Sequence, residues 1–280
     1  MIDGTMVRQA LAQSGLVPLD AQVLLAHVLQ RDRAWLIAHA DDALGREQRD
    51  AFVALARRRR DGEPVAYLTG VREFWGLPFL VSPAVLIPRP ETETLVELAL
   101  ARLPDDRDVG VLDLGTGSGA IAIAIACARP RARVLATDVS VDALALAREN
   151  ARRLCAANVE FLHSDWYENV PRDWPGAPFA LIASNPPYVA GQDPHLLEGD
   201  VRFEPARALS PGGDGLAAIR TIVGGARERL APGGTLVVEH GYDQAERVRE
   251  LFAAPGLAEI VAVRDLAGIP RVVAGRRPFA

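Results

Sequence analysis

The feature that most constrains the fold is an apolar run that ends in closely spaced glycines and is followed by a second apolar run. Residues 109–114 have the character of a buried strand, and residues 120–128, rich in alanine and isoleucine, that of a buried helix. Glycines between them allow a tight turn and let a ligand approach the backbone, and the free N–H groups of the new helix point at that ligand. The spacing differs from the dinucleotide pattern Gly-x-Gly-x-x-Gly. We predict a strand, a glycine turn and a helix that bind a cofactor through Asp113, Gly115, Thr116, Gly117, Ser118 and Gly119.

Polar residues also follow the next two predicted strands, at 133–137 and 159–163. Asp138 ends the first of these strands, in the position where an acidic residue holds a ribose diol. Asp165 and Trp166 follow the second, and a carboxylate beside an indole suits the amino group and ring of adenine. The carboxyl ends of parallel strands meet at one edge of a sheet, so we expect these residues in one ligand site. The alternative for each acid alone is a helix N-cap.

A fourth strand, residues 179–184, ends at Asn185-Pro186-Pro187-Tyr188. The residue before a proline is held extended, and prolines carry no N–H, so this backbone offers hydrogen-bond acceptors only. The side-chain oxygen of Asn185 and the carbonyl of Pro186 form a pair of acceptors suited to the two hydrogens of an –NH2 group. Tyr188 supplies a flat face on which a planar amide or base can stack. Taken alone, the tetrapeptide is more typical of a turn that ends a strand, and the cofactor motif upstream is what favours the binding interpretation.

With these motifs the chain resembles the S-adenosylmethionine-dependent methyltransferases of the seven-strand class. More narrowly, it resembles the bacterial glutamine-N5 methyltransferases that modify peptide chain release factors. One departure is Pro211, where family members often carry glycine. Besides Asn185–Tyr188, the resemblance rests on residues 63–70 (EPVAYLTG), 73–76 (EFWG), 87–93 (IPRPETE), 203–205 (FEP), 208–209 (AL), 212–216 (GGDGL), 239–242 (EHGY) and 265–268 (DLAG).

The resemblance implies S-adenosyl-L-methionine as cofactor. It implies methyl transfer to the side-chain amide nitrogen, N5, of the glutamine in the Gly-Gly-Gln motif of class I peptide chain release factors, which modulates translation termination. Catalytic roles are implied for Asn185, Pro186 and Tyr188, and substrate binding for Asn185, Pro186, Pro187 and Tyr188. Asn185 is expected to lie near the cofactor too. We expect no metal, and a cytoplasmic protein that is a monomer, with no membrane association and no direct nucleic-acid target.

Three parts are expected along the chain. Residues 1–70 carry apolar residues at helical spacing and predict a helical domain that docks the substrate, and residues 71–90 predict a β-hairpin linker. Residues 91–280 predict a Rossmann-like α/β methyltransferase domain. Its strands are expected near 109–113, 133–138, 159–163, 179–184, 234–239, 259–264 and 271–275.

The charge balance limits the remaining function classes. The formal net charge of −5 argues against a free-standing binder of duplex DNA, and the arginine run at 57–60 is more typical of a solvated helix end. Cys127 and Cys155 are predicted to be reduced core residues. Two other interpretations remain. One is an amino-methyltransferase that acts on adenine in DNA or RNA, and the other is a binding protein that kept the fold without catalysis.

Overall fold

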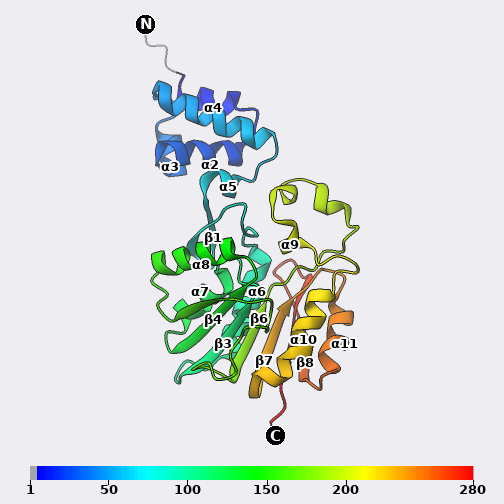
Figure 1. The fold of residues 1–280 in the computed structure, drawn as a ribbon. Coiled ribbons are helices and arrows are strands. Elements are labelled where there is room, and N and C mark those ends of the chain that lie inside the picture. The colour runs from blue at the N-terminus through cyan, green and yellow to red at the C-terminus, as the bar shows by residue number, and fades with distance from the viewer. Residues whose placement is uncertain (1–4, 280) are drawn as a thin grey trace. The chain divides into compact units, whose positions relative to one another are not determined.

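A computed structural model describes residues 5–279, which form two compact units (Figure 1). The first unit contains the chain up to Val71 together with Glu198–Phe203. The second contains Arg72–Leu197 and the chain from Glu204 onward. A short segment from the later part of the chain therefore packs with the amino-terminal helices.

The described part of the first unit is helical, as its spacing of apolar residues predicts. Pro18 is the first residue of its helix, a position that suits its fixed φ and missing N–H. The core of the unit is formed by buried side chains that include Leu24, Leu25, Leu36 and Phe52. The helices are α1 (Val7–Gln13), α2 (Pro18–Leu29), α3 (Arg33–Ala38), α4 (Arg46–Arg60) and α5 (Val65–Thr69).

The arginine run at the end of α4 is partly engaged in packing this unit, whereas the sequence predicts a solvated cluster. Arg59 lies 2.7 Å from Asp20 and 2.6 Å from Asp200, so it ties the segment 198–203 to the helices. Arg58 pairs with Glu63 at 2.5 Å, and Arg60 donates to the carbonyl of Ser14. Three neighbouring arginines thus have partners inside the unit.

The second unit contains a seven-stranded sheet in the order β5-β4-β3-β6-β7-β9-β8. Pairing is parallel from β5 through β7, and β9 is antiparallel to both of its neighbours. All seven predicted strands are present, and the predicted α/β fold is confirmed. The strands are β3 (Val109–Leu114), β4 (Ala132–Asp138), β5 (Val159–His163), β6 (Phe179–Ser184), β7 (Leu230–Glu239), β8 (Ala258–Arg264) and β9 (Pro270–Arg276).

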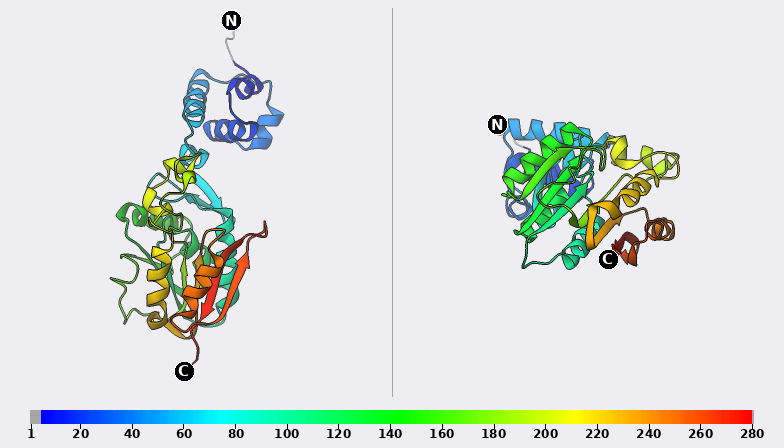
Figure 2. Two further views of the ribbon diagram at one scale, coloured as in Figure 1. Left: turned by 90° about the vertical axis from the view of Figure 1, so that its right-hand side faces the viewer. Right: turned by 60° about the horizontal axis from the view of Figure 1, so that its bottom comes forward.

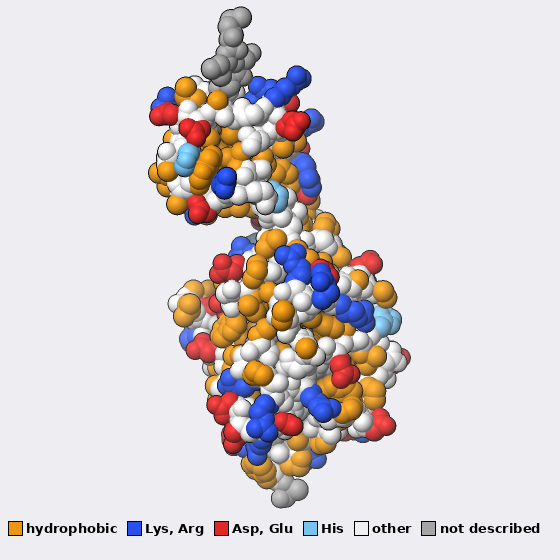
Figure 3. Space-filling model, turned by 90° about the vertical axis from the view of Figure 1, so that its left-hand side faces the viewer, with side chains coloured by type: hydrophobic (Ala, Val, Ile, Leu, Met, Phe, Trp, Pro, Cys, Tyr) orange, Lys and Arg blue, Asp and Glu red, His pale blue; other side chains and the backbone are white. Residues whose placement is uncertain are grey.

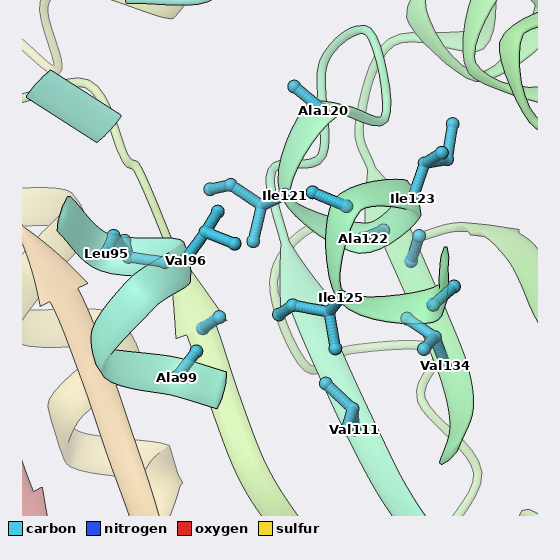
Figure 4. Packing of buried hydrophobic residues seen from close by; sticks show 14 of the residues in the cluster. Leu95, Val96, Ala99, Val111, Ala120, Ile121, Ala122, Ile123, Ile125 and Val134 are labelled. Carbon is cyan, nitrogen blue, oxygen red and sulfur yellow. The ribbon is translucent and has the colours of Figure 1, made fainter. Parts of the chain in front are cut away.

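Helices cover both faces of this sheet (Figure 2). Val111 belongs to one hydrophobic core and Leu112 and Leu114 belong to the other, because successive strand residues point to opposite faces of the sheet. Figure 4 shows the first core, with Ile121 of α7 beside Val96 of α6. The helices are η1 (Pro90–Thr92), α6 (Glu93–Arg102), α7 (Ala120–Ala128), α8 (Val141–Arg153), η2 (Pro194–Leu197), α9 (Ala206–Leu209), α10 (Ala217–Arg229) and α11 (Ala245–Ala253); η3 (Val201–Phe203) belongs to the first unit.

A β-hairpin of β1 (Val71–Phe74) and β2 (Leu77–Leu80) packs on the second unit. Its side chains Phe74 and Phe79 are buried there and meet edge to face at 6.0 Å. Asn150 of α8 bonds the backbone of Leu80 and also donates a 2.9 Å hydrogen bond to the carbonyl of Ser118. A single buried amide therefore connects the hairpin to the glycine turn.

The prediction that Cys127 and Cys155 are core residues is wrong, since both are exposed. Cys127 lies near the end of α7, past the fully buried part of the helix. Cys155 lies in the turn after α8, in the left-handed backbone region at φ 57°. Among the helices described here, none is long and apolar enough to cross a membrane.

Candidate functional site

A pocket opens where β3, β4, β5 and β6 end, at the point where the strand order reverses direction. The loop after each of these four strands contributes to its wall. Most of the site residues predicted from the sequence line it: Gly115, Thr116, Gly117, Ser118, Asp138, Asp165, Trp166, Asn185 and Pro187. The other four, Asp113, Gly119, Pro186 and Tyr188, are not part of the lining.

The turn after β3 has the backbone that only glycine adopts without strain. Gly115, Gly117 and Gly119 have φ angles of 72°, 55° and 83°. At Gly119, which caps α7, an added Cβ would lie 2.8 Å from Ile123 and 3.3 Å from Ala147. The turn therefore brings the start of α7 close to Ala147 of the helix α8, and the first N–H groups of α7 lie at the pocket that the turn lines.

Asp113 lies behind this turn and is fully buried. Its Oδ2 accepts a 2.6 Å hydrogen bond from the hydroxyl of Thr116, and Oδ1 has no partner among the described residues. Burial raises the pKa of Asp113 to about 7, although the bonds from Thr116 and the backbone of Ala122 act in the opposite direction. A buried carboxylate with one free oxygen favours a cationic partner.

Asp138, at the end of β4, lines the pocket and also binds backbone. Its two oxygens accept hydrogen bonds from the N–H groups of Gly117, at 2.9 Å, and Ser140, at 2.8 Å. The N-cap of α8 is Ser140 and not Asp138, so the helix-cap alternative for this acid is not what the structure has; Asp138 binds the backbone of the cap residue instead. Each carboxylate oxygen keeps a further lone pair, which suits the hydroxyls of a ribose.

Asp165 and Trp166, after β5, complete this side of the pocket. Asp165 is exposed and Trp166 is half-buried, with a left-handed backbone at φ 46°. A Cβ at position 115 would lie 3.5 Å from Cζ3 of the indole. The glycine turn and the indole face thus border one space.

Asn185 and Pro187 bring the end of β6 into the same pocket, and Pro186 is buried. The hydroxyl of Ser184 bonds the carbonyl of Leu114 at 2.7 Å and joins this end of β6 to β3. Nδ2 of Asn185 donates a 3.1 Å hydrogen bond to Oγ1 of Thr92.

Tyr188 is anchored through its hydroxyl, which donates to Oε1 of Glu239 at 3.1 Å. Burial raises the pKa of Tyr188, and the neighbouring carboxylate adds to this effect, so the hydroxyl stays protonated and able to donate. Burial also raises the pKa of Glu239 to about 7. The ring of Tyr188 packs against the second hydrophobic core.

Two further segments line the pocket that were not predicted as site residues. One is 84–92, which includes Arg89 and Thr92, and the other is 205–208. They are joined by Glu204, whose buried carboxylate pairs with Arg89 and accepts a 3.0 Å hydrogen bond from the N–H of Ile87. The signal for them is in the sequence, because residues 87–93 and 203–205 are among the stretches that carry the family resemblance.

The combination of groups defines what the pocket can hold. A helix start with three glycines, an acid placed to bind a ribose and an indole suit a nucleoside. The buried acid Asp113, directly behind the glycine turn, suits a positive charge on a chain attached to that nucleoside. Neither histidine nor cysteine is among the described residues that line the pocket. The chemistry that fits is the transfer of a group from a bound nucleoside to an acceptor held at Asn185.

Known proteins resemble the chain over nearly its whole length. Residues 5–70 match the PrmC N-terminal domain, and residues 92–216 match the methyltransferase small domain. The release factor glutamine methyltransferase of Burkholderia pseudomallei is 53% identical over 275 residues, covering 96% of this chain and 95% of that protein. The protein of the same name from Escherichia coli is 49% identical over 257 residues, covering 92% and 91%.

Solved structures share the fold. A methyltransferase from Pyrococcus furiosus superposes with a TM-score of 0.54 at 17% identity, over 80% of this chain and 98% of that one. At this identity the likeness concerns the fold alone.

Proposed function

This chain belongs to the family of release factor glutamine methyltransferases, and from that premise we propose that it methylates the side-chain amide nitrogen of a release factor glutamine. S-adenosyl-L-methionine is the methyl donor. The observation that supports this most directly is that Asn185 lines the same pocket as the glycine turn, Asp138 and Trp166. Donor residues and acceptor residues therefore face one space.

The residues present fit this donor, which supplies a methyl group on a cationic sulfur. Asp138 would hold the ribose, and Trp166 with Asp165 would hold the adenine. The N–H groups at the start of α7 would receive the amino-acid end, and the charge of Asp113, buried directly behind the turn, would favour the positive charge of its ammonium group.

The acceptor residues act on the amide that is methylated. A glutamine amide nitrogen is a weak nucleophile because its lone pair is delocalised into the carbonyl group. Oδ1 of Asn185 and the carbonyl of Pro186 would accept its two hydrogens. Positive charge develops on the nitrogen as it attacks, so these acceptors bind the transition state more strongly than the ground state.

Positioning contributes the other large part of the rate. Holding the nitrogen at near-attack distance from the methyl group lowers the barrier by roughly 7–11 kcal/mol. Tyr188, held through its hydroxyl by Glu239, would keep the acceptor side of the pocket in place. A strong base is not required, because the proton is released after the nitrogen has gained the methyl group.

The protein substrate would be recognised outside the pocket as well. The helical unit exposes large apolar side chains, among them Ile37 at 76% and Val53 at 56% exposure. Figure 3 shows hydrophobic side chains at the surface of this unit, interspersed with charged ones. We propose that residues 1–70 dock a class I release factor, that residues 71–90 link this domain to the catalytic domain at 91–280, and that the factor presents the glutamine of its Gly-Gly-Gln motif. The enzyme would act as a cytoplasmic monomer without a nucleic-acid target.

Labelled methyl transfer tests the proposal. The purified protein is incubated with labelled S-adenosylmethionine and either a release factor, the same factor with its Gly-Gly-Gln glutamine replaced by alanine, or duplex DNA. We expect label on the intact factor only, located by mass spectrometry on that glutamine. Label on DNA, or equal label on the alanine variant of the factor, would contradict the proposed substrate.

A further inference from the structure

A buried acid lies behind the acceptor end of the pocket and belongs to none of the predicted site residues. Glu239, the last residue of β7, has a relative exposure of 1%. Its Oε1 accepts a 3.1 Å hydrogen bond from the hydroxyl of Tyr188, and the side chain of Thr92 lies near enough to the carboxylate to lower its pKa. Oε2 has no hydrogen-bond partner that meets ordinary geometry among the described residues. Both partners of the carboxylate are connected to the segment that begins at Asn185.

The connection to Asn185 runs through Thr92. A threonine hydroxyl has one hydrogen to donate and lone pairs with which it accepts. When the hydrogen is directed to the carboxylate of Glu239, Oγ1 can only accept from Asn185. Nδ2 of Asn185 does donate to Oγ1 of Thr92, at 3.1 Å.

The direction of these bonds decides which end of the Asn185 amide is free. An asparagine amide has nearly the same shape when it is turned by 180°, so its neighbours must determine its orientation. With Nδ2 bound by Thr92, Oδ1 is left for a ligand in the pocket that Asn185 lines. The opposite direction, with Thr92 donating to Oδ1, would present Nδ2 to the acceptor amide, and two –NH2 groups would then face each other.

We propose that Glu239 is a positioning residue for methyl transfer, which acts through Thr92 to keep Oδ1 of Asn185 turned toward the acceptor glutamine. The inference rests on the proposed function of Asn185 as an acceptor for the amide hydrogens. Glu239 itself does not line the pocket, so it acts on the reaction only through Thr92 and Tyr188.

We call the chain of hydrogen bonds from Glu239 through Thr92 to Asn185 the relay. It depends on the carboxylate of Glu239 being ionised, because a protonated acid can donate to Thr92 and reverse the direction of the bonds. Burial, with a smaller contribution from the charge of Glu91, raises the pKa of Glu239 to about 7. The bonds from Thr92 and Tyr188 and the charge of Arg271 lower it. The neighbouring His240 is buried, and burial lowers its pKa, so it is neutral in the same range. Glu239 thus titrates near neutral pH.

Substitutions at Thr92 test the relay without removing the buried acid. Thr92→Val keeps the shape of the side chain and removes the hydroxyl, and Thr92→Ser keeps the hydroxyl as a matched control. Single-turnover methyl transfer is measured with full-length release factor at saturating cofactor, and cofactor affinity is measured by calorimetry. We expect Thr92→Val to be slower by about 10²-fold, the usual effect of a misplaced catalytic group. Thr92→Ser should stay within about threefold of wild type. A wild-type rate for Thr92→Val overturns the inference.

Combination with Asn185→Ala separates a relay from an independent effect. If Thr92 acts through Asn185, Thr92→Val should slow the Asn185→Ala enzyme no further. A further 10²-fold loss in the double variant would overturn the relay while leaving the role of Asn185 intact. A wild-type rate for Asn185→Ala alone would instead contradict the proposed function, so the two failures are distinguishable.

The pH profile gives a readout that a purely structural role would not change. At saturating cofactor the wild-type rate should fall as the pH decreases through about 7, because protonation of Glu239 reverses the relay. Glu239→Gln has no ionisable group at this position, so this limb of the profile should be absent in that variant. Persistence of the same limb in a folded Glu239→Gln protein overturns the inference.

Discussion

Thr116 donates a 2.6 Å hydrogen bond to Oδ2 of Asp113, and the other oxygen of this carboxylate has no partner among the described residues. The glycine turn therefore closes over an acid that is only half satisfied. Burial raises its pKa to about 7, against 3.8 for an exposed aspartate. This one relationship has consequences for stability and for cofactor binding.

The first prediction concerns the stability of the cofactor-free protein. Because the folded protein holds the proton of Asp113 more tightly than the unfolded chain does, stability is favoured below about pH 4 and decreases as the pH rises toward 7. The loss from this group amounts to at most about 4 kcal/mol. Denaturant unfolding of Asp113→Asn and wild type at pH 5 and pH 8 should show the variant gaining stability relative to wild type at the higher pH. An unchanged difference between the two proteins would show that Asp113 keeps an ordinary pKa.

The second prediction concerns cofactor binding and pH. A positively charged ligand group in the pocket near Asp113 stabilises the ionised acid, so binding should release a proton below about pH 7. Affinity for S-adenosylmethionine should then increase by up to about tenfold per pH unit between pH 5 and 7 and level off above. Calorimetry on wild type and Asp113→Asn checks this. The same rise in both proteins would assign the proton to another group.

The third prediction concerns Asp138, which combines a structural and a proposed binding role. Asp138→Ala should weaken cofactor binding by about 1.5–3 kcal/mol, the value of a hydrogen bond to a charged group. Ser140→Ala is the matched control, because it removes the cap of α8 and leaves the carboxylate in place. Its dissociation constant should stay within about threefold of wild type. If calorimetry gave Asp138→Ala an unchanged dissociation constant, the acid would serve only to hold the backbone of Gly117 and Ser140.

The sequence predicts the parts of the site that are contiguous along the chain. Residues 115–118 and Asp138 are found because each follows an apolar strand and the sheet brings strand ends together. Thr92 escapes this reasoning, since it lies 93 positions from Asn185 in a short helix and meets Asn185 only in the folded chain. Glu239 does end a predicted strand, but the sequence does not show that its carboxylate binds Tyr188.

The packing of Glu198–Phe203 with the amino-terminal unit is also not predicted from the sequence. It includes the ion pair of Asp200 with Arg59 and the hydrogen bond from Arg202 to the carbonyl of Asp61, each between residues separated by 141 positions. For the cysteines, the sequence predicts burial that the structure does not have. Cys127 follows an apolar pattern that predicts burial, but it lies where the helix has passed the edge of the core.

The fourth prediction tests the proposed docking by the helical unit. Ile37→Asp and Val53→Asp place charges where large apolar side chains are exposed, and Leu266→Asp is a control at an exposed position in the other unit. Each of the first two should raise KM for the release factor by about fivefold or more, the cost of losing an interface contact worth about 1 kcal/mol. Cofactor affinity should stay unchanged in all three variants, and KM for the release factor should stay unchanged in Leu266→Asp. If KM did not change in either variant, these side chains would lie outside the docking surface.

The last prediction concerns Asn185, on which the proposed chemistry depends. Asn185→Ala removes one acceptor for the amide hydrogens and leaves the prolines and the glycine turn in place. Charge develops on the amide nitrogen only in the transition state, so the loss should fall mainly on the methyl-transfer step. We expect a decrease of about 10²–10³ in the single-turnover rate at saturating cofactor and release factor, because a preorganised polar group of this kind contributes about 3–4 kcal/mol.

Asn185→Asp makes the same test sharper. It keeps the size of the side chain and an acceptor oxygen. Its added charge attracts the cationic donor, and its carboxylate oxygens cannot donate to Oγ1 of Thr92 as Nδ2 of asparagine does. The variant should bind the cofactor at least as tightly as Asn185→Ala and still transfer the methyl group slowly. Calorimetry and single-turnover kinetics on the two variants separate these effects. A wild-type transfer rate in Asn185→Ala would leave residues 185–188 as a structural turn at the end of β6.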